Sequence, residues 1–296
     1  MAQPTPASTR SRSGASKAAA ASKKAAYRTL PEIPIAELDE LDTRLLAESL
    51  TDFGLRTDVS TFIMQLSHPG VAERVLREDA RSGGSHAYLV ARNRMTWNGI
   101  AVAAIGSAHD RNAYREALRS RRFDGGHAHL DTEMPDAERL WIAACIYLSL
   151  EDVYDRVYGP MFGATLDRFY GEGVSIAATF QVPSELWPAT REDMDAYWQS
   201  MLPQLSINKE VRSYLLRVAK TGMVPRWLRR RSTLESQLDA LGFLPPEIRK
   251  LLRLKWITEH QDVFNDRTTA GVERARKKSR WAHLLPYRLL LWNMHL

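Results

Sequence analysis

The stretch PDAERLWIAACIYLSLEDVYDRVYGP, residues 135–160, decides the fold class of this chain. The proline and aspartate at its start are residue types that begin a helix, and the glycine-proline pair at its end is a type that stops one. The residues between contain no further proline or glycine, and apolar side chains fill the middle. The stretch therefore predicts one long, largely buried helix that runs to about Val157.

Helical signals continue on both sides of this stretch. Apolar side chains recur at helical spacing, and cap and stop residues separate the segments. The sequence contains no regular period-2 alternation, fixed-period repeat or glycine-rich phosphate loop. It therefore predicts an all-α fold, a single multi-helix domain over residues 30–296. The further helices expected lie at 36–50, 61–66, 71–76, 88–105, 113–121, 192–201, 234–241, after the prolines 245–246, and at 269–283.

Residues 1–29 differ from the rest in composition. They are rich in Ala, Ser, Lys and Arg, which predicts a disordered basic tail. The formal net charge is +6, and six bases without an acid lie in residues 1–28, so the remaining chain is neutral. We therefore expect no nucleic-acid partner for the folded part. A peripheral membrane contact stays open for the tail.

The cysteine count and the length of the apolar runs indicate the cellular compartment of the protein. Cys145 is the only cysteine, which excludes an internal disulfide framework and a thiolate metal cluster. It lies in the longest apolar run, which has about half the length of a membrane span, so we expect it to be buried. The N-terminus shows no compact apolar signal. These observations predict a cytoplasmic protein.

The densest cluster of metal-ligand residue types is GGHAHLDTE, residues 125–133. Imidazole and carboxylate groups suit iron, manganese or zinc, so His127 and His129 with Asp131 or Glu133 are candidate metal ligands. The alternative is a polar loop between helices. No HExxH, GxSxG or Ser-x-x-Lys motif occurs, so the sequence gives no support to a zincin site or to covalent hydrolase chemistry.

Arg92 and Thr96 lie four residues apart and therefore share one face of the helix expected over 88–105. The rest of this helix is small and apolar, which predicts burial. A buried arginine needs an anion. That anion is either an internal carboxylate or a ligand's propionate or phosphate.

The C-terminal segment 281–296, WAHLLPYRLLLWNMHL, follows a basic run at residues 274–278. A basic segment followed by an apolar one is typical of a helix that rests on a membrane surface. It is equally compatible with docking on the body of the protein or on a second subunit. The oligomeric state is not predicted.

Several ordered motifs resemble one known family, the catalytic domain shared by ER-bound mpaB-type oxygenases and rubber oxygenases (latex-clearing proteins). The resemblance covers roughly residues 60–200, and the later helices fit the family's Leu-Pro-Pro pattern. Its pieces are QLSHPGVA at 65–72, RNRMT at 92–96, the helix start at 135–141, YDRVYGP at 154–160 and LWPATREDM at 186–194.

The resemblance implies a globin-like helical core that binds haem b and activates dioxygen against isoprenoid-like or other apolar substrates. Arg92 and Thr96 then lie beside the haem as catalytic and cofactor-binding residues, with His68 as a further pocket residue. Met95 and Arg119 occupy two other cofactor positions.

This chain departs from the family at the iron ligands. The family's proximal histidine falls on Arg119, its second histidine on Ala143, and a distal lysine on Met95. Arginine stays protonated and cannot serve as an ordinary axial ligand. The first hypothesis is therefore a haem b oxygenase with His127 or His129 at the iron. The alternatives are a non-haem metal enzyme using the same cluster, or a cofactor-free helical protein that binds a hydrophobic ligand.

Overall fold

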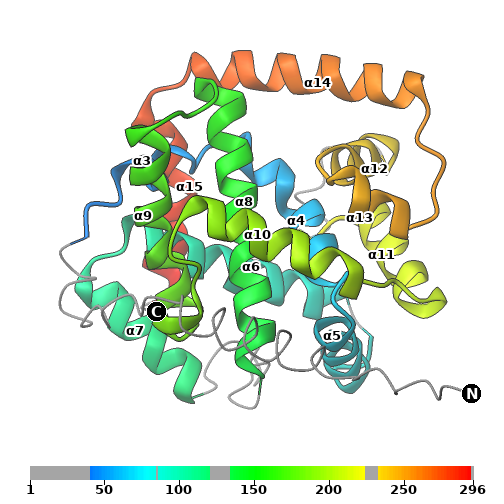
Figure 1. Cartoon of the computed structure of the whole chain (residues 1–296), viewed down its shortest axis with the longest axis horizontal. Coiled ribbons are helices and arrows are strands. Elements are labelled where there is room, and N and C mark those ends of the chain that lie inside the picture. The colour runs from blue at the N-terminus through cyan, green and yellow to red at the C-terminus, as the bar shows by residue number, and fades with distance from the viewer. Residues whose placement is uncertain (1–40, 85, 121–133, 224–232, 295–296) are drawn as a thin grey trace, which may run out of the picture.

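The computed structural model describes residues 41–84, 86–120, 134–223 and 233–294, with side chains omitted for 115–120 and Thr233. These residues form helices and contain no strand, so the all-α prediction is confirmed (Figure 1). The helices are α3 (Arg44–Glu48), α4 (Asp58–Gln65), α5 (Pro69–Arg81), α6 (His86–Ile105), α7 (Ala108–Ser120), α8 (Asp136–Tyr158), α9 (Ala164–Thr179), α10 (Arg191–Met201), α11 (Lys209–Thr221), α12 (Thr233–Gly242), α13 (Pro246–Leu251), α14 (Thr258–Arg276) and α15 (Arg280–Met294), with 3-10 turns η1 (Gly54–Thr57), η3 (Ser184–Leu186) and η4 (Leu202–Gln204).

Helix α8 is the helix that the opening stretch predicts, and it runs through the middle of the molecule (Figure 1). It packs against α4, α9 and α14. Gly159 ends it with φ of 101°, a left-handed conformation that favours glycine. Cys145 is fully buried in it, as expected, and burial raises the pKa of its thiol.

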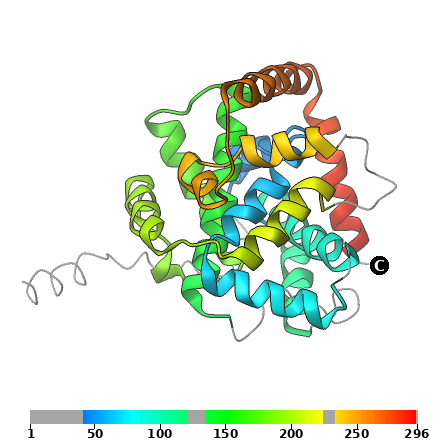
Figure 2. The same ribbon diagram turned by 90° about the vertical axis from the view of Figure 1, so that its right-hand side faces the viewer.

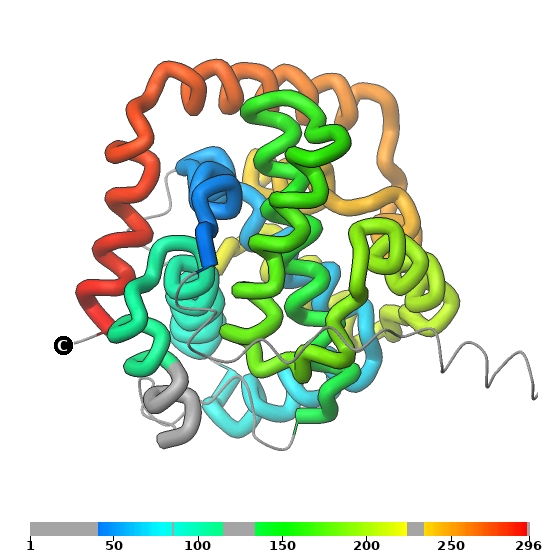
Figure 3. Tube along the Cα trace, turned by 60° about the vertical axis from the view of Figure 1, so that its left-hand side comes forward, coloured from blue at the N-terminus to red at the C-terminus, as the bar shows by residue number. Residues whose placement is uncertain are grey.

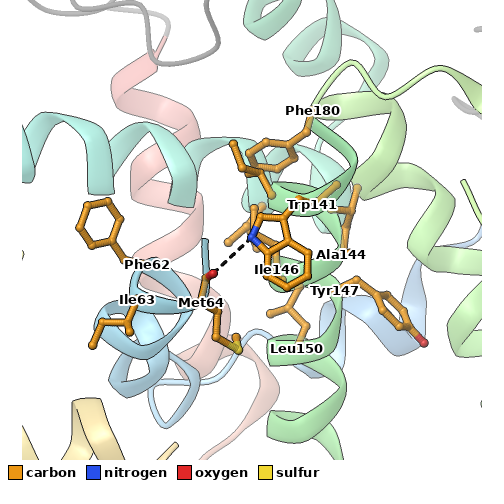
Figure 4. Packing of buried hydrophobic residues seen from close by; sticks show 14 of the residues in the cluster. Phe62, Ile63, Met64, Trp141, Ala144, Ile146, Tyr147, Leu150 and Phe180 are labelled. Atoms are coloured by element: carbon orange, nitrogen blue, oxygen red, sulfur yellow. Dashed lines mark hydrogen bonds between the residues drawn. The ribbon is translucent and has the colours of Figure 1, made fainter. Parts of the chain in front are cut away.

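Trp141 fixes α8 against α4. Its indole Nε1–H donates to the Met64 carbonyl at 3.2 Å and to the Gln65 carbonyl at 3.1 Å, as Figure 4 shows for Met64. Its ring stacks on Trp198 at 5.1 Å between centroids. Both carbonyls lie at the end of α4 and also accept the backbone N–H groups of Ser67 and His68, so this side chain adds a second donor to each and fills the core at the same time.

Helix α6 lies against α9 and α15. Ser175 on α9 donates to the Ala103 carbonyl at 2.6 Å, and Thr43 donates to the Ala104 carbonyl at 2.8 Å. The views in Figures 1 and 2 place α6 behind α8, so that α4, α6 and α8 enclose the centre of the protein. The candidate site lies at this junction.

The expected helix over 269–283 is wrong in its bounds. The structure has two helices here, α14 and α15, which break at residues 277–279. Ser279 begins the second helix, since its Oγ accepts from the Ala282 N–H at 3.3 Å. The expected helix over 36–50 is helical only at Arg44–Glu48 in its described part.

Two helices, α9 and α11, were not among those expected. For α11 a local signal exists, because Asn208 caps it by accepting from the Val211 N–H at 2.9 Å. Thr190 caps α10 in the same way, since its Oγ1 accepts from the Asp193 N–H at 3.1 Å. Within the described ranges, no helix combines the length and apolarity needed to cross a membrane.

Candidate functional site

A small cavity lies where η1, α4, α6 and α8 meet. Its volume is about 20 Å³, which is room for roughly one water molecule. Phe62, Ile146 and Leu150 of its wall are labelled in Figure 4. The polar side chains that line it are Arg92, Asn93, Thr96, Asp58, Thr61 and Ser149.

Arg92 is the dominant charge in this wall. It is 6% exposed, and its Nε has no hydrogen-bond partner. No described carboxylate forms an ion pair with it. Its guanidinium carbon lies 5.7 Å from the centre of the Phe62 ring, and Thr96 donates its hydroxyl to the Arg92 carbonyl at 3.2 Å. The expected anion of Arg92 is therefore not an internal carboxylate of the described chain.

The hydroxyl of Tyr88 is a neutral neighbour of Arg92. Burial raises the pKa of Tyr88, while the charge of Arg92 and a hydrogen bond from it act in the opposite direction. A neutral phenol satisfies a donor but does not balance a charge. The cavity wall carries the Asp58 carboxylate on its α4 side and the Arg92 guanidinium on its α6 side, where the unpartnered Nε of Arg92 favours an anionic or oxygen-rich group.

A larger cleft of about 450 Å³ borders the cavity. Thr57 and Ser149 line both spaces. At this border, Thr61 Oγ1 lies 2.8 Å from both the Thr57 carbonyl and Ser149 Oγ, and Ser149 donates to the Cys145 carbonyl. Thr57 and Ser149, which line both spaces, form with Thr61 a polar seam at this border. The rest of the cleft wall combines aromatic and aliphatic side chains with charged ones, namely Trp198, Phe243, Phe264, Met64 and Leu148 with Asp152, Arg156, Asp195 and Arg249.

Haem b does not fit the described walls of the cavity. Haem iron is held by histidine, cysteine, tyrosine or methionine, and of these types only Met223 is among the described lining residues. The volume also falls far short of a porphyrin. No group of three metal-ligating side chains occurs within the described ranges either.

The structure brings together only part of the set that the sequence predicts. Arg92 and Thr96 line the cavity, whereas Met95 on the same helix is buried in the core outside its walls. His68 caps α5, accepting from the Val71 N–H at 3.4 Å.

Three predicted residues cannot be placed at the site. His127 and His129 lie outside the described residues, and for Arg119 in α7 only the backbone is described.

Sequence reasoning missed Asn93, whose Nδ2 donates to Asp58 Oδ2 at 3.4 Å and to the Met223 carbonyl at 3.3 Å. Its place directly beside Arg92 was the available signal.

His68 gives a pH-dependent prediction. Burial lowers its pKa from 6.5, and the charge of Glu138 partly opposes this shift. Its stabilising contribution is therefore complete above pH 6.5 and is lost as the pH falls through the folded-state pKa. We expect His68→Asn, which keeps a cap acceptor but does not titrate, to lose less free energy of unfolding below about pH 6.5 than the wild type. Urea denaturation at several pH values measures this, and equal pH slopes would contradict it.

Family comparison agrees with the motifs. Residues 53–274 match the family model described as ER-bound oxygenase mpaB/B'/Rubber oxygenase, catalytic domain. The chain belongs to this family. Because the family is an oxygenase catalytic domain, membership supports an oxygenase, and hence oxidoreductase, role with dioxygen and a small-molecule substrate.

Two relatives from mycobacteria are similar over most of their length. They are the uncharacterized protein Mb2261 of Mycobacterium bovis and the uncharacterized protein Rv2237 of Mycobacterium tuberculosis. Each is 33% identical over 236 residues, covering 78% of this chain and 92% of the relative. No solved structure matches the chain. The match of the family model includes all four cavity-forming elements, η1, α4, α6 and α8.

Proposed function

We propose that this chain oxygenates an apolar, isoprenoid- or lipid-like molecule whose polar end is held by Arg92. The observation that carries the proposal is a buried arginine without a described carboxylate partner, facing a cavity in an oxygenase-family domain. A bound carboxylate, phosphate or other oxygen-rich group supplies the missing anion. The proposal includes a cytoplasmic location and a division into a tail, 1–29, and one helical domain, 30–296.

In this proposal the cavity and the neighbouring cleft bind different parts of the ligand. The cavity is too small for more than a polar end group, whereas the cleft of about 450 Å³ has the size of a small-molecule site. Trp198, Phe243 and Phe264 supply the apolar part of the cleft wall, against which we place the body of the ligand. We place the chain of the ligand in the cleft and its polar end beyond the seam at Thr57 and Ser149, against Arg92 and Thr96.

Haem b enters this proposal only through His127 and His129. The described walls do not fit it, so no reaction step is derived through haem. A haem held by these histidines remains our first hypothesis for the redox centre, and a non-haem metal on His127, His129 and Asp131 is the second. Among the described residues that line the cavity, only Met223 is of a type that ligates haem iron. This favours a further candidate function, cofactor-free binding of a hydrophobic molecule.

The test is an absorption spectrum and metal analysis of protein expressed with a haem precursor, followed by dioxygen uptake with apolar acids and neutral isoprenoids. A Soret band with near-stoichiometric iron, lost in the His127→Ala/His129→Ala double variant, supports the haem hypothesis. A Soret band that survives in the double variant overturns that ligand assignment. Metal without a Soret band supports the non-haem centre. No uptake with any substrate, without bound metal or haem, overturns the oxygenase proposal in favour of a binding protein.

A further inference from the structure

Helix α15 exposes an apolar surface on the side that faces away from the protein. The side chains concerned are Trp281 and Trp292, each 61% exposed, with Leu285 and Leu289 between them. Their spacing of four, four and three residues places them along one side of the helix. We call these four residues the α15 stripe.

The opposite side of α15 is already occupied. His283, Leu284, Tyr287 and Leu291 are buried, and the helix packs along α6. Figures 2 and 3 both show α15, in red, at the outer edge of the molecule. The helix is therefore apolar on two sides, and docking on the body of the protein accounts for only one of them.

The charged side chains of α15 and of the segment before it are all basic, and Asp52 pairs with one of them, Lys278. Residues 274–296 contain six bases and no acid. Arg288 is exposed on the same side of the helix as Leu285 and Trp292, and Arg280 precedes Trp281. Neither arginine forms an ion pair with a described acidic side chain. The surface thus combines exposed tryptophan and leucine with cations that have no internal counter-charge.

We propose that the α15 stripe docks on the surface of a lipid bilayer that contains anionic lipids. The two tryptophans lie eleven positions apart, about 16 Å along the helix axis. A helix that lies in the membrane interface has this combination of features, with aromatic and leucine side chains toward the lipid and basic residues toward acidic headgroups. Tryptophan in particular prefers the headgroup level.

Charge argues against the other occupants. A two-fold dimer through the stripe would bring the same surface of two copies together, and hence bases against bases. The N-terminal segment 1–28 carries six bases and no acid, so it lacks complementary charge as well. An anionic surface is the partner that complements this helix.

Docking at the stripe would place the lipid one helix away from the cavity. Tyr287, on the buried side of α15, meets the Trp97 ring edge-on at 5.7 Å, and Trp97 lines the cavity. This arrangement suits a protein that takes an apolar ligand from a membrane. The docking proposal itself depends only on α15 and stands without the proposed function.

The experiment is co-sedimentation of the full chain with phosphatidylcholine vesicles, with and without about 30% phosphatidylglycerol. We expect binding only to the anionic vesicles, weakened by salt. The Trp281→Ser/Trp292→Ser double variant should partition at least about tenfold less, and Arg288→Gln about fivefold less. Leu234→Ser, which removes a 63% exposed leucine on α12, is the matched control and should bind like the wild type.

Far-UV circular dichroism tests whether the variants are folded. We expect them to fold, because the substituted side chains are exposed. Equal binding to neutral vesicles, no binding to anionic vesicles, or unchanged binding of the double variant would each overturn the proposal. Light scattering that shows a dimer of the wild type and a monomer of the double variant would overturn it in favour of a second copy as the occupant.

Discussion

Arg92→Met should weaken ligand binding by about tenfold to a hundredfold, the value of a hydrogen-bonded charge. Methionine keeps the length of the side chain and removes the charge that the cavity directs at the ligand. The free energy of unfolding should stay the same or rise by about 1 kcal/mol, because the wild type buries a charge with no described carboxylate partner. Affinity and stability therefore change independently.

Arg94→Met is the matched control, since it removes the same charge from an exposed position of the same helix. It should leave affinity unchanged within about twofold. Isothermal titration measures the affinity, and urea denaturation measures the stability. A loss of several kcal/mol of stability with unchanged affinity would make Arg92 a structural residue and would contradict its role in the site.

Asp239→Ala should lower the free energy of unfolding by about 3–5 kcal/mol. Asp239 is 2% exposed, and its carboxylate accepts from Arg56 Nη2 at 2.5 Å and from Arg56 Nε at 3.2 Å. Arg267 reaches the same carboxylate at 3.3 Å. Removing Asp239 leaves Arg56 buried, with the Arg267 carbonyl as a neutral acceptor, and an uncompensated buried charge is expensive.

Glu235→Ala provides the control in the same network. Glu235 pairs with Arg267 at 2.7 Å but is 41% exposed. Solvent screens such a pair, so its removal should cost about 1 kcal/mol or less. Urea denaturation of both variants gives the comparison, and equal losses would show that burial does not set the strength of this network.

Arg56 and Arg92 explain why sequence reasoning reached the site only in part. Both are buried arginines, and burial alone requires an anion for each. The sequence cannot reveal which one has an internal partner, because Asp239 lies 183 residues from Arg56 and is brought to it by the packing of α12. The spacing of Arg92 and Thr96 was readable, since one helix turn fixes it locally. The sequence did not reveal that α4 and α8 contribute to the cavity, because that depends on how the helices pack.

The helices show the same contrast between features that local sequence fixes and features that tertiary packing sets. The bounds of α8 follow from local chemistry at its two ends, and the prediction holds. The break between α14 and α15 depends on a serine cap and on the packing of α15 along α6, so a prediction from periodicity joins part of both. The candidate ligands His127 and His129 lie outside the described residues, and their role stays a prediction.

The central claim is that Arg92 holds the polar end of a bound molecule. Mass spectrometry of the molecules extracted from the purified wild type, Arg92→Met and Arg94→Met tests it most directly. We predict one apolar molecule with an anionic or oxygen-rich end, near-stoichiometric in the wild type and in Arg94→Met and depleted at least about tenfold in Arg92→Met. The same molecule in equal amounts in all three proteins would contradict the account.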